Sequence, residues 1–126
     1  MDTQPLQVLI ITAAGRLCTS LQAVVASLPM VCGVYTAADE ATGVQKLTTT
    51  FIDVVVLDGE LPRAVQQRIL RHLQQSTHAI TTILFGGTEQ AHQRALYAGV
   101  TTWLSIDCST ELLARKIHNA YQARQS

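Results

Sequence analysis

Short, continuously apolar runs alternate along this chain with segments in which apolar residues recur every three or four positions. Such runs predict buried strands, whereas the recurrent spacing predicts helices with one apolar face. The predicted strands are 6–11, 31–36, 51–58, 80–85 and 101–106. The predicted helices are 17–28, 39–47, 65–73, 88–99 and 109–121. The chain is therefore expected to contain five strands and five helices in strict alternation.

Strands that are apolar throughout are buried on both faces, which is typical of a parallel sheet covered by helices. Right-handed crossovers between parallel strands leave few topologies for a chain of this length. We therefore predict an α/β fold with a flavodoxin-like, doubly wound, five-stranded parallel sheet in the order 2-1-3-4-5. In such sheets functional groups lie at the carboxyl ends of the strands.

Two polar residues mark predicted helix starts. Asp39 precedes the second helical segment and Ser109 precedes the last one, where their side chains can accept a backbone N–H of the first turn.

The composition narrows the possible functions. The 126 residues fit one domain, and nine basic residues balance nine acidic ones. This balance argues against a basic surface that grips nucleic acid. No apolar run approaches the roughly 20 residues that a membrane span requires. The first residues lack the pattern of a signal peptide, so a cytoplasmic location is expected.

Asp58 is the main candidate for chemistry, because it ends the predicted strand 51–58 just before a turn. The other strand ends offer Thr12, Gly86 and Ile106, so no second acid and no lysine joins it. Without neighbouring acids, Asp58 is expected to accept backbone N–H groups from the 86–87 or 14–15 loops. Arg16 is close enough in sequence to neutralise it.

Two strings carry a family resemblance. The string Val-Val-Val-Leu-Asp-Gly-Glu-Leu-Pro, 54–62, is similar to the phospho-acceptor strand and turn of bacterial response-regulator receiver domains, the CheY-like superfamily. The string 98–113, with its Gly, Trp-Leu and Ser-Thr-Glu-Leu-Leu, resembles the NarL/LuxR-type class. The resemblance covers essentially the whole chain.

The departures from the family pattern are as informative as the matches. Thr12 and Ala13 stand where receivers have the two acids that hold Mg²⁺. Gly86 replaces the hydroxyl residue and Ile106 replaces the lysine, while Trp103 takes the place of the switch aromatic. Of the five active-site positions only Asp58 remains. We therefore expect weak or absent Mg²⁺ binding, no other cofactor, and little or no phosphorylation of Asp58.

The resemblance then implies a pseudo-receiver rather than an enzyme. Residues 1–121 would form the receiver-like domain, and residues 122–126 would begin a linker to a C-terminal helix-turn-helix output domain that this chain does not contain. The expected partners are a second copy, through the first, fourth or fifth helix, and a histidine kinase or other signalling protein. DNA would be contacted only by the output domain, and a membrane partner is not expected.

Two alternative functions remain open. In the first, Asp58 is a working phospho-acceptor for a histidine kinase. In the second, the crevice at the strand ends binds a small ligand such as a nucleotide, flavin or quinone, because the acids that would repel an anion are missing.

Overall fold

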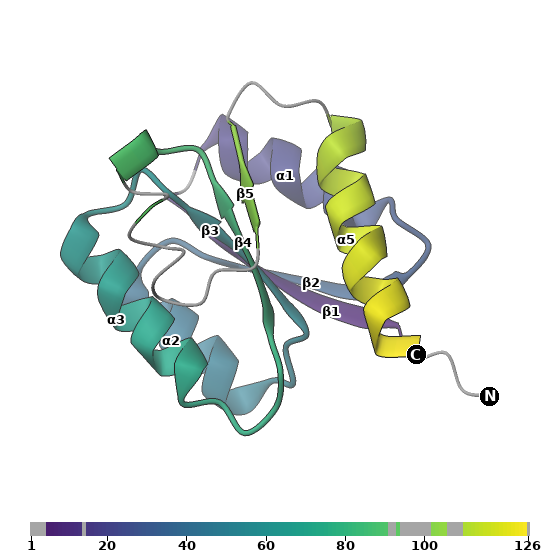
Figure 1. The fold of residues 1–126 in the computed structure, drawn as a ribbon, viewed down its shortest axis with the longest axis horizontal. Helices are drawn as coiled ribbons and strands as arrows, with labels where there is room; N and C mark the ends of the chain where they lie inside the picture. The colour runs from purple at the N-terminus through teal and green to yellow at the C-terminus, as the bar shows by residue number, and fades with distance from the viewer. Residues whose placement is uncertain (1–4, 14, 91–92, 94–101, 106–109, 126) are drawn as a thin grey trace.

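The computed structural model describes residues 5–13, 15–90, 93, 102–105 and 110–125. Figure 1 shows helices packed against both sides of a twisted sheet. The strands are β1 Leu6–Ile11, β2 Val31–Ala37, β3 Val54–Asp58, β4 Thr81–Phe85 and β5 Thr102–Leu104. The helices are α1 Arg16–Ala26, α2 Glu40–Thr49, α3 Arg63–Gln74 and α5 Thr110–Gln125. The helix predicted for 88–99 falls largely outside the described residues.

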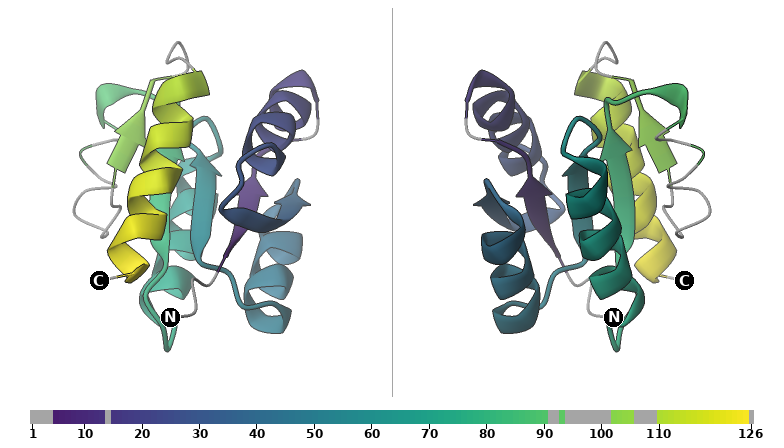
Figure 2. Two further views of the ribbon diagram at one scale, coloured as in Figure 1. Left: turned by 90° about the vertical axis from the view of Figure 1, so that its right-hand side faces the viewer. Right: turned by 90° about the vertical axis from the view of Figure 1, so that its left-hand side faces the viewer.

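The sheet confirms the predicted topology. Its order is β2-β1-β3-β4-β5, and every neighbouring pair is parallel. The strand arrows accordingly point the same way in Figure 2, so the carboxyl ends of all strands meet at one edge of the sheet. The chain is a doubly wound α/β domain, as expected.

Two apolar layers enclose the sheet, because side chains of a strand alternate between its faces. Helices α1 and α5 cover one face, and α2 and α3 cover the other (Figure 2). The first layer contains Val8, Ile10, Leu21, Val25, Val54, Val56, Ile83, Leu113 and Ile117, among others. The second contains Leu9, Ile11, Val55, Leu57, Ile69, Leu70 and Leu84, among others.

Strand β3 lies at the centre of the sheet, and all five of its residues are buried. The register pairs Ile11 of β1 with Leu57, and Asp58 with Phe85 of β4. Because the strands are parallel, the residues that follow β1 and β4, Thr12 and Gly86, lie on either side of Asp58. Three positions that are far apart in sequence thus meet at one point.

The predicted start of α2 agrees with the structure, whereas α5 is longer than predicted. Asp39 caps α2, since its Oδ1 accepts the backbone N–H of Thr42 at 2.8 Å. Ser109 lies outside the described residues. Helix α5 continues past Tyr121, the predicted end of the last helix, to Gln125. No helix in the described part of the chain combines the length and apolar character needed to cross a membrane.

Candidate functional site

Asp58 is the last residue of β3, and only 9% of its surface is exposed. Its Oδ2 accepts the hydroxyl of Thr12 at 2.7 Å, and its Oδ1 accepts the backbone N–H of Glu60 at 2.8 Å. These donors differ from the loop amides that we expected. The Gly86 amide bonds instead to the carbonyl of Leu104 at 2.8 Å. Both carboxylate oxygens of Asp58 thus have a partner within the protein.

The turn after Asp58 is held by Gln66, which is buried on α3. Its Nε2 donates to the carbonyl of Gly59 at 2.9 Å and to that of Leu61 at 2.6 Å. We did not identify this residue from the sequence. The available signal was an amide side chain in a helical segment, next to the apolar positions Val65 and Ile69. Gln66 fixes the position of the turn and therefore of the Glu60 N–H.

Three glycines allow the turn after β3 to touch the loop after β4. A Cβ atom at Gly59 would overlap the carbonyl oxygen of Gly86, and one at Gly87 would lie 2.8 Å from the carbonyl oxygen of Gly59. Gly86 and Gly87 also have φ values of 76° and 90°, which side chains disfavour. The two backbones can approach this closely only because Gly59 and Gly87 lack a side chain. The contact fills space beside Asp58 at the edge of the sheet.

Trp103 holds the same loop from β5. Its indole Nε1–H donates to the carbonyl of Gly86 at 3.2 Å, and 43% of the residue is exposed. Gly86 therefore connects Trp103 to the turn that follows Asp58. Ile106 and most of the helix predicted for 88–99 lie outside the described residues.

The ion pairs of the described residues lie away from Asp58. Within the described ranges the ion pairs are Arg68–Glu40 at 2.7 Å and Arg124–Asp53 at 3.8 Å, so neither involves Asp58. Arg16 is exposed and is not paired with it. In that same part of the chain, no group of three or more His, Cys, Asp or Glu side chains could hold a metal ion.

Thr12 and Ala13, which follow β1, supply little to a metal ion. Thr12 offers a neutral hydroxyl whose proton is already donated to Asp58, and Ala13 has no side-chain oxygen. Mg²⁺ needs near-octahedral oxygen coordination, commonly anchored by one or two carboxylates. The described residues at this end of the sheet are therefore a poor fit for Mg²⁺.

A second polar cluster lies at the opposite end of the sheet, around Asp53. The carboxylate of Asp53 accepts the backbone N–H of Gln7 at 2.9 Å and faces Arg124. Arg124 also donates to the carbonyls of Asp53 at 2.6 Å and Ala79 at 3.0 Å. This cluster attaches the end of α5 to the loops that lead into β3 and β4.

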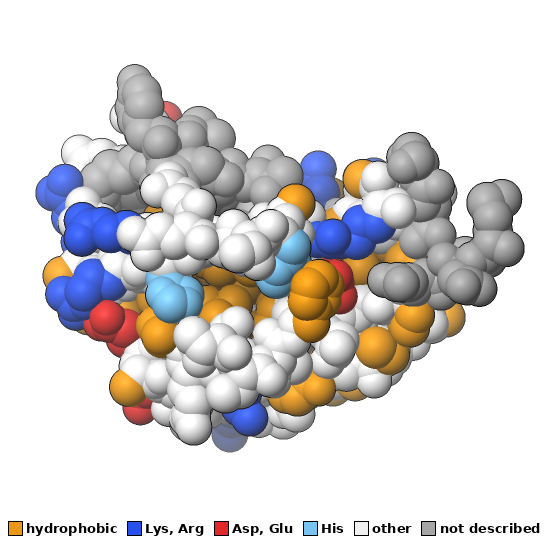
Figure 3. Space-filling view, turned by 90° about the horizontal axis from the view of Figure 1, so that it is seen from below, with side chains coloured by type: hydrophobic (Ala, Val, Ile, Leu, Met, Phe, Trp, Pro, Cys, Tyr) orange, Lys and Arg blue, Asp and Glu red, His pale blue; other side chains and the backbone are white. Residues whose placement is uncertain are grey.

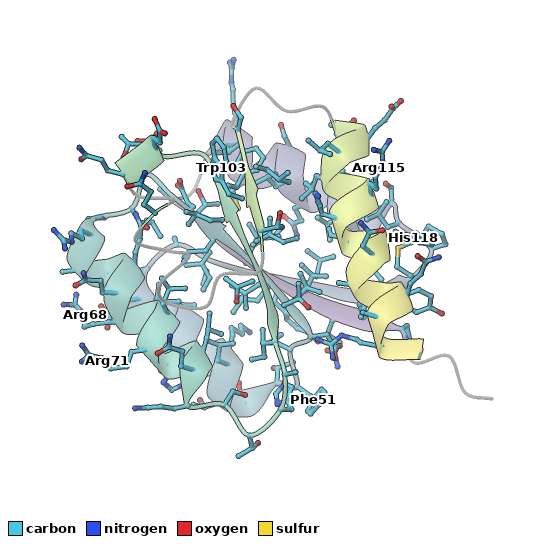
Figure 4. All side chains as sticks on the ribbon, in the orientation of Figure 1. Phe51, Arg68, Arg71, Trp103, Arg115 and His118 are labelled. Carbon is cyan, nitrogen blue, oxygen red and sulfur yellow. The ribbon has the colours of Figure 1, made fainter. Side chains whose placement is uncertain are left out.

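His78 lies near this cluster, with its ring stacked on Phe51 at a centroid distance of 3.9 Å. Its Nε2–H bonds to the carbonyl of Ile52 at 2.8 Å. Phe51 is 58% exposed and lies at the far end of the molecule from Trp103 (Figure 4). His118 lies on α5, and His92 lies outside the described residues.

A hollow of ≈ 310 Å³ opens beside His78 at this amino end. Its walls include Leu47, Leu73 and Ile80 together with His72. In Figure 3 histidine side chains lie on both sides of an apolar floor. The alternative ligand site lies at the carboxyl ends of the strands, which is the opposite end of the sheet. This hollow is therefore separate from Asp58.

Solved structures of other proteins share this fold. A signal receiver domain of an HD-domain-containing protein from Pseudomonas fluorescens Pf-5 superimposes with a TM-score of 0.85 at 20% identity, covering 99% of this chain and 93% of that one. The receiver domain of the NarL response regulator from Mycobacterium tuberculosis gives 0.82 at 14% identity, covering 94% and 98%.

A third structure, the receiver domain of the sensor histidine kinase PA1611 from Pseudomonas aeruginosa PAO1, has a magnesium ion coordinated in its active-site cleft. It gives a TM-score of 0.80 at 17% identity, covering 94% of this chain and 98% of that one. No protein-family model matches the chain, and no curated protein matches it either. The sheet order, the helical layers and these superpositions together show that this chain has the fold of response-regulator receiver domains.

Proposed function

We propose that this chain is an atypical receiver domain, a signal-transduction module and not an enzyme, whose state does not depend on Mg²⁺-assisted phosphorylation of Asp58. The observation that carries the proposal is the hydrogen bond from the Thr12 hydroxyl to Asp58 Oδ2 at 2.7 Å. In the receiver pattern this position holds an acid that binds the metal. Here the residue at that position bonds to the acceptor carboxylate itself.

The chemistry of phosphoryl transfer explains why this matters. A carboxylate attacks a phosphoryl group through a lone pair of one oxygen, and the incoming negative oxygens need a cation or other positive groups to stabilise them. Both oxygens of Asp58 accept hydrogen bonds, and neither ion pair among the described residues lies there. Each oxygen keeps a second lone-pair site, so attack is not blocked, but neither described ion pair supplies a cation at Asp58 to compensate the incoming charge.

If phosphorylation does not set the state of the domain, another input must. Protein partners, a second copy of the chain or a small ligand are the remaining inputs. The output would be a helix-turn-helix DNA-binding domain C-terminal to this chain, as the resemblance to the NarL/LuxR-type class implies. Asp58 then acts as an anchor for the turn 59–61, not as a signalling residue.

Phosphorylation can be tested directly. The protein is incubated with acetyl phosphate and Mg²⁺, and its intact mass is measured. In parallel, Mg²⁺ and beryllofluoride are titrated while the fluorescence of Trp103, the single tryptophan, is followed. We expect no added phosphoryl group and no saturable fluorescence change. A stable phosphoryl adduct that Asp58→Asn abolishes would overturn the proposal and favour the alternative of a working phospho-acceptor.

A gain-of-function variant tests whether the missing carboxylate at position 12 explains the expected absence of Mg²⁺ binding. Thr12→Asp places a second carboxylate beside Asp58, where it can complete a Mg²⁺ anchor. We expect Mg²⁺ to change the fluorescence of Trp103 in this variant and not in the parent. Thr12→Asn, of nearly the same shape but uncharged, is the matched control and should not respond. A parent protein that binds Mg²⁺ as tightly as Thr12→Asp would contradict the explanation.

A further inference from the structure

The outermost strand β2 has one unpaired edge. Among the described strands it pairs only with β1, and its seven residues, Val31–Ala37, make it the longest of them. It contains no charged residue and no proline. Natural edge strands commonly carry such residues to prevent pairing with other chains. The edge of β2 lacks these two protections.

The backbone direction of β2 shows which residues face outward. The Thr12 N–H donates to the carbonyl of Ala37 at 3.0 Å, so the backbone groups of Ala37 face β1. The register with β1 is regular from Gly33 to Ala37, and successive residues in a strand face opposite sides. Val34 and Thr36 therefore direct their N–H and C=O groups away from β1, toward the open edge.

Half-buried apolar side chains lie beside this edge on the α1 face of the sheet. They belong to β2, to α1 and to the loop between them. They pack against the core but remain partly exposed to solvent. They are Val24, Leu28, Met30, Val31 and Val34. A partner strand along β2 would bury part of this apolar surface in addition to the backbone groups.

We propose that two copies of this chain pair through β2, antiparallel and about a two-fold axis at Val34. Antiparallel pairing is self-complementary, so it closes as a dimer and leaves no further β2 edge. Val34 then faces Val34 of the second copy in a hydrogen-bonded pair, and Cys32 faces Thr36. None of these pairs brings like charges together, because the strand has no charge.

The size of the contact sets the expected affinity. A stable interface commonly uses 20–30 residues on each side. Seven strand residues and a few apolar neighbours are fewer than this. We therefore expect a dimer with a dissociation constant in roughly the micromolar range, which forms and dissociates with protein concentration. The interface is at β2 and does not involve Asp58. A test of the dimer is therefore independent of a test of the proposed function.

Sedimentation velocity across about 1 µM to 1 mM protein tests this inference. Val34→Lys puts two like charges opposite each other and is expected to raise the dissociation constant roughly tenfold or more. Gln67→Lys, an exposed residue on α3, adds the same charge away from β2 and should change nothing. Circular dichroism verifies that each variant is folded. If Val34→Lys does not fold, Thr36→Lys takes its place.

Disulfide cross-linking locates the contact. Val34→Cys is made in a background with Cys18, Cys32 and Cys108 changed to Ser. Hydrogen-bonded residues across antiparallel strands have Cα atoms about 5.5 Å apart, within the range of a disulfide. We expect a covalent dimer from Val34→Cys and none from Gln67→Cys. The inference is overturned by a chain that is monomeric throughout, or by a dimer that Val34→Lys leaves intact and that cross-links through Arg115→Cys on α5.

Discussion

Asp53 and Asp58 bracket the central strand β3, and each has 9% of its surface exposed. Their surroundings differ. Asp53, at the amino end, accepts one backbone N–H and faces the guanidinium of Arg124 at 3.8 Å. Asp58, at the carboxyl end, accepts a hydroxyl and a backbone N–H and has neither of the described ion pairs.

The difference shows how the same residue type serves two purposes at the two ends of one strand. The Asp53 cluster joins segments 71 residues apart, because Arg124 on α5 bonds to the loop before β3. It is a structural device that combines charge with hydrogen bonds. Asp58 is satisfied by neutral donors that hold a turn in place. At the carboxyl end of β3, neutral donors hold Asp58 and the turn after it. The cation Arg124 lies at the amino end, beside Asp53.

The largest effect is expected from filling the backbone contact beside Asp58. Gly59→Ala forces a Cβ against the Gly86 carbonyl, and neither backbone can yield easily. We expect a loss of about 3 kcal/mol in the free energy of unfolding, at the upper end of overpacking effects. Urea denaturation measures it.

Gly43→Ala is the matched control for that substitution. Its Cβ would meet the end of the flexible Ile11 side chain at 3.2 Å, and the helical position favours alanine. We expect almost no loss of stability there. Equal losses in the two variants would contradict the view that the carboxyl end is held by backbone contact.

The next largest loss of unfolding free energy is expected at Asp53, and a smaller one at Asp58. Asp53→Asn keeps an oxygen for the Gln7 N–H but removes the charge that faces Arg124, so we expect a loss of about 2 kcal/mol. Asp58→Asn should lose less than about 1 kcal/mol, because the amide can accept from Glu60 and donate to Thr12.

A double-mutant cycle with Arg124→Gln sharpens this comparison. Its coupling energy should be measurable for Asp53 and near zero for Asp58, because only Asp53 lies beside the guanidinium. Coupling of the same size at both aspartates would refute the distinction.

A smaller effect is expected at Thr12. Thr12→Val keeps the shape of the side chain but removes the hydroxyl that donates to Asp58, and we expect a loss of about 1 kcal/mol. Thr12→Ser keeps the hydroxyl and should retain most of the hydrogen bond. Chemical denaturation compares the two variants, and a larger loss for serine than for valine would show that methyl packing, not the hydrogen bond, matters at this position.

The smallest effect concerns an exposed aspartate that serves as a reference for the two buried ones. The backbone N–H of Thr42 stabilises the charged form of Asp39 and lowers its pKa below the ordinary value. A lowered folded-state pKa contributes stability above the unfolded pKa, and this contribution is lost as the pH falls through the folded-state value.

The unfolding free energy of Asp39→Asn should therefore change less with acid than that of the parent, since asparagine caps the helix without titrating. A titration of the Asp39 carboxyl by NMR gives the direction of the pKa shift. A raised pKa would contradict the capping geometry.

The sequence by itself determined the five strands, the order of the sheet and the position of Asp58 at a strand end. It also gave the cap at Asp39. These features follow from periodicity and from residues close in the chain, since burial on a strand or helix repeats at fixed intervals. The residues that follow the other strands, Thr12 and Gly86, were visible in the same way.

Only the tertiary structure decided which polar atoms meet. Thr12 and Asp58 are 46 residues apart, and no pattern along the chain indicates that the hydroxyl donates to the carboxylate. Likewise, Gln66 could be found only by tracing the carbonyls of the turn, and Gly59 only by its contact with Gly86. A hydrogen bond depends on distances and directions between whole elements, and these are fixed only when the layers have packed together.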